Sequence, residues 1–174
     1  MNIIILAGNS HENYTWAQKI KATLGNFAKI TIQDYDHWKS SNKFINMPEE
    51  KKKLIEIASG LENYVILAKS IGVILAIQSI YEQNIKPSKC IFAGMAFNWA
   101  KENNYPIDQW LGSYSIETLF IQNENDPAIS FEDLRCVINK NNTVNYQLIK
   151  LLGDNHKYNA DTIAELTKQF LEIK

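Results

Sequence analysis

Short apolar runs alternate with longer segments of helical spacing along the whole chain, and this alternation constrains the fold more than any other feature. The apolar runs, which we predict to be strands, cover residues 3–7, 29–34, 64–69, 89–93, 118–122 and 146–151. The segments that we predict to be helices cover residues 14–24, 49–59, 71–83, 131–139 and 161–173. Continuous apolar strands separated by helices are typical of a mainly parallel sheet that is buried on both faces. We therefore predict an α/β fold with three layers, α/β/α, and a mainly parallel six-stranded sheet, for which we take the strand order to be 2-1-3-4-5-6.

Composition narrows the class of protein. The 174 residues suffice for one domain, residues 1–174, and the fractions of 45% apolar and 21% charged residues are those of a globular protein. The net charge is -1 and Arg135 is the single arginine, which argues against binding to nucleic acid or to an anionic membrane. Residues 3–7 are too short to span a bilayer and follow no basic segment, so we expect a cytoplasmic protein without a signal peptide. The sequence contains no feature that sets an oligomeric state.

The cysteines and histidines give no sign of a metal site. Cys90 and Cys136 lack the close pairing of zinc motifs, and His11, His37 and His156 include no pair spaced as ligands on one helix. We predict neither a metal nor a cofactor. His37 follows the second predicted strand, and we expect it at the surface.

A serine stands at the junction between the third predicted strand and the helix that follows it without a spacer. Ser70 lies between Ala68 and Gly72, and a tight strand-to-helix turn needs small residues at these positions because it forces neighbouring backbones together. This context is that of a nucleophile elbow, in which the serine Oγ points out from the carboxyl edge of the sheet. Ala68 differs by one methyl group from the usual G-x-S-x-G pattern. The neutral interpretation of Lys69 is an elbow residue that faces solvent.

An acid and a histidine follow later predicted strands in the order that an α/β-hydrolase arrangement requires. Asp126 comes after the fifth strand and His156 after the sixth. Taken singly, Asp126 also fits a turn before a proline, and His156 also fits a surface loop. Together they predict a catalytic triad with Ser70. Asp154 is the alternative acid, and His11 is the alternative base.

Two backbone amides are predicted to form an oxyanion hole. One belongs to Ile71, and the other belongs to the loop after the first strand, where Gly8 permits a sharp turn and Asn9 directs its amide inward. The backbone amide of Ser10 is the alternative to that of Asn9. In the predicted strand order, the loops after strands one and three flank the crevice where α/β proteins bind ligands. Asn9 and Ser10 equally fit caps for the helix that starts near Tyr14.

One stretch, residues 94–115, does not follow the alternation and is long for a connection in one domain. It is either a lid or pocket wall, or an irregular connection with a short helix whose aromatic side chains complete the core. Among its aromatic residues, Phe97, Trp99 and Trp110 are candidates for the wall of a substrate pocket.

Together these stretches resemble the α/β-hydrolases, specifically their small dienelactone-hydrolase-like and serine-esterase-like members. The resemblance is carried by Leu6-Ala-Gly-Asn-Ser10, Leu67-Ala-Lys-Ser-Ile-Gly72, Leu119-Phe-Ile-Gln-Asn-Glu-Asn-Asp-Pro127 and Leu152-Gly-Asp-Asn-His156. It implies Ser70 as nucleophile, Asp126 as acid and His156 as base. Larger members have two strands before the strand that bears the oxyanion loop, so a minimal, six-stranded version is expected here. Ala68, and Asn9-Ser10 in place of a glycine-rich oxyanion loop, depart from the family pattern.

The predicted function is hydrolysis of a small carboxylic ester, or a related acyl compound, through an acyl-enzyme. The scarcity of arginine disfavours a strongly anionic substrate, and the aromatic residues favour an apolar one. One alternative is a flavodoxin-like flavin-binding protein, because the same strand order places a cofactor over the loop of residues 8–15. This alternative leaves Asp126 and His156 without a role. Another alternative is an α/β-hydrolase scaffold with weak catalysis that serves as an interaction module.

Overall fold

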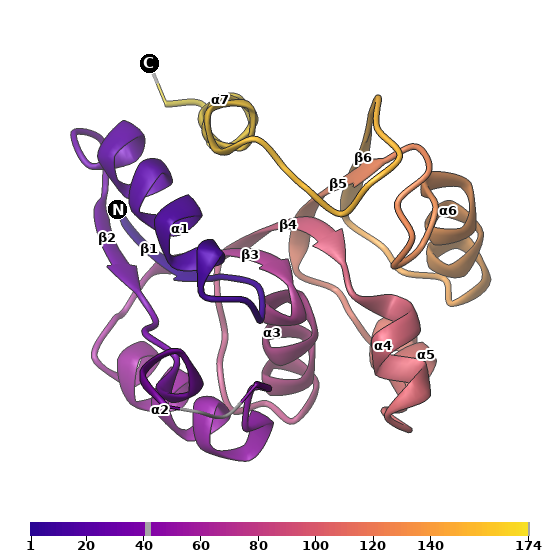
Figure 1. The fold of residues 1–174 in the computed structure, drawn as a ribbon, viewed down its shortest axis with the longest axis horizontal. Helices are drawn as coiled ribbons and strands as arrows, with labels where there is room; N and C mark the ends of the chain where they lie inside the picture. The colour runs from indigo at the N-terminus through magenta and orange to yellow at the C-terminus, as the bar shows by residue number, and fades with distance from the viewer. Residues whose placement is uncertain (41–42, 174) are drawn as a thin grey trace.

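Six strands form one sheet in the order β2-β1-β3-β4-β5-β6, and every neighbouring pair is parallel (Figure 1). The strands are β1 (Asn2–Leu6), β2 (Lys29–Ile32), β3 (Tyr64–Ser70), β4 (Lys89–Met95), β5 (Glu117–Asn123) and β6 (Tyr146–Leu151). This computed structural model describes residues 1–40 and 43–173. The predicted fold class and strand order are confirmed, and the sheet is wholly parallel.

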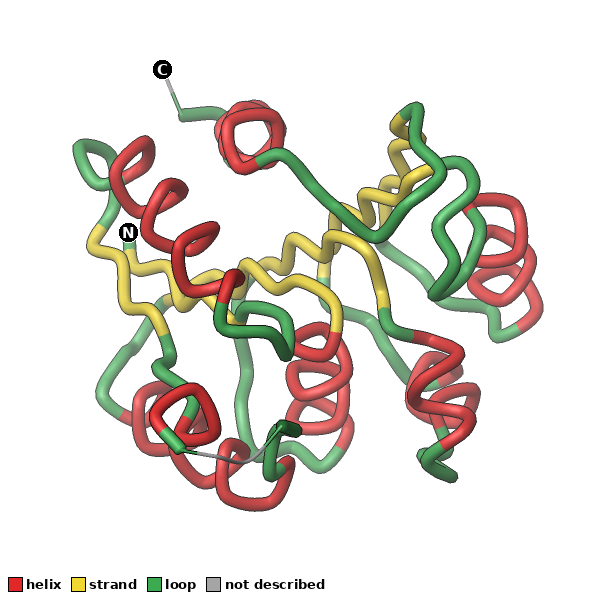
Figure 2. Tube along the Cα trace, viewed as in Figure 1, coloured by secondary structure: helices red, strands yellow, loops and turns green. Residues whose placement is uncertain are grey.

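Helices cover both faces of this sheet, and Figure 2 shows the strands lying between two groups of helices. The α-helices are α1 (Glu12–Leu24), α2 (Met47–Ser59), α3 (Ile71–Tyr81), α4 (Phe97–Glu102), α5 (Ile107–Gly112), α6 (Phe131–Lys140) and α7 (Ala160–Phe170). Helices α1 and α7 pack on one face, and the other α-helices pack on the opposite face. None of the helices in the described part of the chain has the length and the apolar run needed to cross a bilayer.

Both faces of the sheet are buried, which explains the continuous apolar strands. Side chains alternate between the two faces along a strand. In β3, Ile66 and Ala68 belong to the core shared with α2 and α3, whereas Val65 and Leu67 belong to the core shared with α1 and α7. A strand that serves two cores has no polar face, so its sequence shows no alternation.

Polar side chains cap two of the helices on the face that carries α3. The Oδ1 of Asn46 accepts a hydrogen bond from the backbone N–H of Glu49 at the start of α2. The Oγ of Ser130 accepts one from the backbone N–H of Asp133 at the start of α6. Each bond satisfies an amide that has no partner within its helix and contributes about 1 kcal/mol. The starts of both helices therefore follow from local sequence.

The end of α3 differs from the prediction. The apolar pattern predicts a helix over residues 71–83, whereas α3 ends at Tyr81. Gln83 has a φ of 58°, a left-handed conformation that ends a helix. The apolar pattern reflects which side chains are buried and not the backbone angles, so it does not predict where this helix ends.

The stretch of residues 94–115 contains two short helices, α4 and α5. Ile107, Trp110 and Leu111 of α5 are buried in the same core as α3. Each helix has only six residues, which is fewer than two turns and too few to produce a recognisable apolar period.

Gly72→Ala is expected to destabilise the fold, because α3 approaches the backbone of β1 closely at this position. A Cβ on Gly72 would lie 2.3 Å from the carbonyl oxygen of Leu6 and 2.8 Å from that of Ala7. Backbone atoms do not yield like a flexible side chain, so we expect a loss of about 2 kcal/mol or more in the free energy of unfolding. Urea denaturation measures this loss.

The matched control is Gly60→Ala, where the nearest atom to a new Cβ is the carbonyl oxygen of Ile57 at 3.9 Å. We expect its stability to stay within about 0.5 kcal/mol of the wild type. Equal stability of the Gly72→Ala variant and the wild type would contradict the close packing of α3 on β1.

Candidate active site

The chain turns from β3 into α3 at Ser70 without an intervening residue. Ser70 has φ 56° and ψ -120°, a backbone conformation that costs a residue other than glycine on the order of 1–3 kcal/mol. The pairing between β3 and β4 shifts its register between Lys69 and Ser70. The half-buried serine therefore stands on a strained turn at the carboxyl edge of the sheet.

The two small residues around Ser70 lie in tight surroundings. Ala68 is fully buried in the core on the α3 side of the sheet, and it pairs with Leu6 on β1 and Phe92 on β4. Gly72 lies against the backbone of β1. The methyl group of Ala68 is thus accommodated, whereas Gly72 has no room for one.

Three side chains at or after the ends of three strands, β3, β5 and β6, form a continuous series of hydrogen bonds. His156 Nε2 lies 2.8 Å from Ser70 Oγ, and His156 Nδ1 lies 2.9 and 2.8 Å from the two carboxylate oxygens of Asp126. Because a carboxylate only accepts hydrogen bonds, Nδ1–H is the donor to Asp126. In the neutral imidazole, Nε2 is then free to accept the hydroxyl proton of Ser70.

Asp126 is the most enclosed member of the series, since its side chain has 0% exposure while that of His156 has 28%. The backbone N–H of Ala128 donates to Oδ1 at 2.8 Å, and the hydroxyl of Tyr158 donates to Oδ2 at 2.6 Å. Asp126 therefore makes the turn contact expected before a proline and the contact with His156 at the same time. Tyr158 could not be predicted as part of this series, because no sequence motif marks it.

The two predicted oxyanion donors belong to the segments that follow the neighbouring strands β1 and β3. The Ile71 amide is at the start of α3, where helical N–H groups have no partner within the helix. The loop of Asn9 is held by its neighbours: the Asn9 carbonyl accepts from Trp38 Nε1 at 2.8 Å and from His37 Nε2 at 2.6 Å. The expectation that His37 lies at the surface is wrong, because a 3-10 helix over Asp36–Lys39 brings its ring against this loop.

The alternative role of Asn9 and Ser10 as helix caps finds no support. The residue at the cap position of α1 is His11, and no side chain forms a capping hydrogen bond there. Ser10 instead accepts two hydrogen bonds from Asn13 Nδ2, through its carbonyl oxygen at 3.1 Å and its Oγ at 2.8 Å. Gly8 is packed against the same Asn13 side chain, which a Cβ would meet at 2.8 Å.

Lys69 is buried, so the expectation that it faces solvent is wrong. Its ammonium donates to Asn13 Oδ1 at 2.5 Å and lies 5.6 Å from the centre of the Trp16 ring, under α1. Burial lowers the pKa of Lys69 to about 8, and the carboxylates of Asp126 and Glu12 oppose this effect. The residue that precedes Ser70 is therefore a buried amine.

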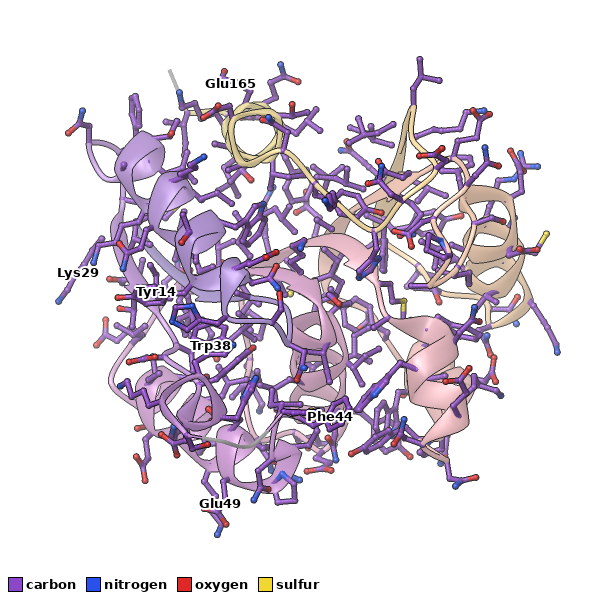
Figure 3. All side chains as sticks on the ribbon, viewed as in Figure 1. Tyr14, Lys29, Trp38, Phe44, Glu49 and Glu165 are labelled. Atoms are coloured by element: carbon purple, nitrogen blue, oxygen red, sulfur yellow. The ribbon has the colours of Figure 1, made fainter. Side chains whose placement is uncertain are left out.

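The alternative base and acid lie apart from this series. His11 is exposed, and its ring contacts Tyr14 and Trp38, which lie side by side in Figure 3. Asp154 is also exposed and contacts the neighbouring Asn155. Within residues 1–40 and 43–173, no group of His, Cys, Asp and Glu side chains is arranged to hold a metal ion.

The three candidate pocket residues line three different cavities. Phe97 lines a cavity of about 380 Å³ together with Asp126. Trp99 lines one of about 720 Å³ together with Phe44, and Trp110 lines one of about 320 Å³ together with Tyr81. The structure therefore does not gather Phe97, Trp99 and Trp110 around a single pocket.

No protein-family model matches the chain, and no curated protein matches it with significant similarity. Among solved structures, the chain is similar to an uncharacterized protein from Bacillus cereus, with a TM-score of 0.76, 18% identity, and coverage of 98% of this chain and 59% of that one. It is similar to an esterase from Pyrococcus furiosus, with a TM-score of 0.75, 14% identity, and coverage of 98% and 82%. It is also similar to Est1E from Butyrivibrio proteoclasticus, in a structure with bound ferulic acid, with a TM-score of 0.76, 15% identity, and coverage of 98% and 88%.

These similarities establish the fold. The parallel sheet in the order 2-1-3-4-5-6, with helices on both faces, is a minimal α/β-hydrolase fold. The resemblance to the α/β-hydrolases that the sequence indicates is therefore confirmed at the level of the fold. The chain spans 59% of the protein from Bacillus cereus, so that protein is considerably longer.

Lys69→Met is expected to change how the stability of the protein depends on pH. The pKa of Lys69 is about 8 in the folded protein, against an ordinary value of 10.5. Below about pH 8 both the folded and the unfolded states carry the charge, so the cost of burying it, on the order of 3 kcal/mol, is fully present. Between about pH 8 and 10.5 the folded protein releases this proton before the unfolded chain does, and the cost falls as pH rises.

Relative to the wild type, the Lys69→Met variant should therefore gain most stability near neutral pH and progressively less toward about pH 10. Urea unfolding at a series of pH values measures this difference. Lys86→Met, at an exposed position, is the control for the loss of a lysine. A stability difference between the Lys69→Met variant and the wild type that does not change with pH would contradict the burial of the ammonium.

Proposed function

We propose that this protein is a serine hydrolase that cleaves a small carboxylic ester through an acyl-enzyme. The observation that carries the proposal is the series of hydrogen bonds from Ser70 through His156 to Asp126. These residue types, in this order of contact and on an α/β-hydrolase fold, suit nucleophilic acyl transfer. The likeness to an esterase of the same fold supports the choice of an ester substrate.

In the proposed reaction, Ser70 Oγ attacks the ester carbonyl carbon while His156 Nε2 takes the hydroxyl proton. Asp126 holds Nδ1–H and stabilises the imidazolium that forms. His156 then gives the proton to the departing alkoxide, which leaves as the alcohol, and the acyl group remains on Ser70. Water attacks this acyl-enzyme with His156 again as the base, and the carboxylic acid is released.

When Ser70 attacks, negative charge develops on the carbonyl oxygen of the ester. We propose that this oxygen accepts hydrogen bonds from the backbone amides of Ile71 and Asn9. The Ile71 amide is at the first residue of α3, so the positive end of the helix dipole adds to the stabilisation. Asn9 belongs to the loop after β1, which is the neighbour of β3 in the sheet. This proposal requires no metal and no cofactor.

The apolar part of the ester is proposed to bind in the cavity between Phe44 and Trp99. The cavity has a volume of about 720 Å³, within the range of roughly 300–1,000 Å³ that is usual for small-ligand sites. The Trp99 ring stacks on the Tyr105 ring with their centres 5.5 Å apart, and Phe44, labelled in Figure 3, lines the same cavity and is 70% exposed. Aromatic walls favour an aromatic or apolar acyl or alcohol group.

The cavity is lined by residues 44–48, by Trp99 of α4, and by Asn103 and Tyr105 after α4. The Asn9 side chain accepts from the Ile45 N–H and donates to the Lys43 carbonyl, both at 2.9 Å, so it holds the chain on either side of Phe44. The chain that leads to Trp99 starts near Ser70, because Met95 of β4 pairs with Ser70 and α4 starts two residues later. We place the apolar part of the ester in this cavity and its carbonyl group at Ser70, which is not itself among the lining residues.

The two alternative functions make different predictions. A flavin carrier leaves the contacts among Ser70, His156 and Asp126 without a purpose, and it would be yellow. An interaction module with weak catalysis keeps these contacts but lacks an activated nucleophile. Labelling with a fluorophosphonate probe separates this reading from an active hydrolase, because only an activated serine reacts.

Ser70→Ala and His156→Ala are expected to abolish ester hydrolysis, and Ser70→Ala is expected to abolish fluorophosphonate labelling. Asp126→Asn should lower kcat by about 10⁴, because the amide can donate to the imidazole and favours the wrong tautomer. A spectrophotometric assay with a p-nitrophenyl ester and gel-based detection of the probe provide the measurements.

Matched controls test the alternative acid and base. His11→Ala and Asp154→Asn should retain wild-type kcat, because both residues are exposed and neither contacts Ser70 or His156. Wild-type labelling and turnover in the Ser70→Ala variant would rule out the proposed function.

Trp99→Ala is expected to weaken the binding of aromatic esters selectively. Removing the ring should lower kcat/KM by about tenfold for a phenyl-bearing ester, mainly through KM, while leaving kcat/KM for an aliphatic acetate ester nearly unchanged. Steady-state kinetics with the two esters measures this selectivity. Phe27→Ala, which removes an exposed ring that is not in the cavity lining, is the control. Equal losses for both esters would contradict the assignment of the cavity.

A further inference from the structure

Tyr158 contacts the proposed catalytic acid from a position that the reaction itself does not use. Its hydroxyl donates to Asp126 Oδ2 at 2.6 Å and accepts from the backbone N–H of Asn123 at 3.0 Å. The side chain is buried, and its backbone carbonyl accepts from Trp16 Nε1 of α1 at 2.9 Å. Tyr158 is therefore fixed from β5 and from α1, and it bonds the oxygen that also faces His156.

Asn123 acts on the loop that carries His156. Its side-chain amide donates to the carbonyl of Asn155 at 2.8 Å and to the carbonyl of Lys157 at 3.0 Å. These two carbonyls lie on either side of His156 in the chain. Asn123 is the last residue of β5, so one side chain ties both flanks of the histidine to the end of a buried strand.

Two glycines, which lack a Cβ, leave space for the side chains of Tyr158 and Asn123. Gly94 of β4 has a φ of 59°, and a Cβ there would lie 2.2 Å from Cε2 of Tyr158. A Cβ on Gly153 would lie 3.0 Å from Cγ of Asn123. Figure 1 shows the connection from β6 to α7 passing over the end of β4, which brings Tyr158 against Gly94. Larger residues at these glycines would displace Tyr158 and crowd Asn123.

We propose that Tyr158 and Asn123 are positioning residues of the hydrolase: Tyr158 orients the Asp126 carboxylate, and Asn123 holds the loop on both sides of His156. The inference rests on the proposed function, and it adds two residues that do not touch the substrate. A carboxylate with a fully buried side chain needs several donors, and its donors here are His156, Ala128 and Tyr158. Burial, together with the Asp126 carboxylate, raises the pKa of Tyr158, so its hydroxyl keeps its proton and remains a donor.

Orientation of the acid matters because His156 must present Nε2 to Ser70 throughout the reaction. Both carboxylate oxygens of Asp126 lie at nearly equal distances from His156 Nδ1. The imidazole ring can therefore change its orientation unless the carboxylate is itself held in place. Loss of Tyr158 or Asn123 should therefore lower kcat and leave KM unchanged, since neither residue lies in the proposed binding cavity.

The experiment compares Tyr158→Phe and Asn123→Ala with two matched controls. Tyr146→Phe removes an exposed hydroxyl bond to Asn139, and Asn141→Ala removes an amide bonded to Val137 and Asp108. We expect kcat to fall by about tenfold or more in the first pair, the size expected for a lost hydrogen bond to a charged group, and to stay at the wild-type level in the controls.

Proton NMR gives a readout that does not require turnover. The downfield resonance of the His156 Nδ1 proton should shift or broaden in the Tyr158→Phe and Asn123→Ala variants and should be unchanged in both controls. Circular dichroism reports whether each variant is folded, and Tyr158→Phe, which keeps the ring, decides the result if Asn123→Ala fails to fold.

The outcomes distinguish the two proposals. Wild-type protein whose Ser70 does not react with the fluorophosphonate would overturn the proposed function. Wild-type protein that reacts, together with wild-type kcat and an unchanged resonance in the Tyr158→Phe variant, would overturn only the positioning role. A lower kcat with a displaced resonance and an unchanged KM supports it.

Discussion

Parallel pairing of all six strands is the constraint on which the rest of this structure depends. Because the strands run the same way, their carboxyl ends share one edge of the sheet, and the segments that follow β1, β3, β5 and β6 meet there. Ser70, Asp126 and His156 are far apart in the chain and come into hydrogen-bond contact only through this arrangement. Parallel strands also require helical crossovers, which cover both faces and leave this edge as the natural place for a ligand.

The strained turn at Ser70 is sustained by packing on both sides of it. The strand before it is buried between two cores, and the apolar helix after it lies against the backbone of β1 at Gly72. A positive φ at a serine persists only where the surroundings leave no other path for the chain. Here the fixed directions of β3 and α3 supply that restriction, so the cost of the turn is met by burial of the elements that it joins.

Two asparagines hold the loops at this edge in the same manner. Asn9 bonds the chain on both sides of Phe44, and Asn123 bonds the chain on both sides of His156. A loop lacks the regular hydrogen bonds of a strand or helix, and one amide side chain carries both donors and an acceptor for backbone groups. The order of the site therefore rests on polar side chains at strand ends as well as on the apolar cores. Tyr158 completes this arrangement between Asn123 and Asp126.

Local patterns in the chain were enough to predict the strands and most helices, because burial on both faces leaves a continuous apolar run and a helix leaves its own period. Ser70, Asp126 and His156 follow three of the predicted strands in the order that an α/β-hydrolase triad requires. From this order we predict that they meet at one edge of the sheet. The burial of Lys69 and His37 could not be predicted, since it depends on α1 and on the Asn9 loop, which approach them only in the folded chain. The roles of Asn123 and Tyr158 could not be predicted for the same reason. Their hydrogen bonds join residues that are distant in the chain and form only once folding has brought those residues together.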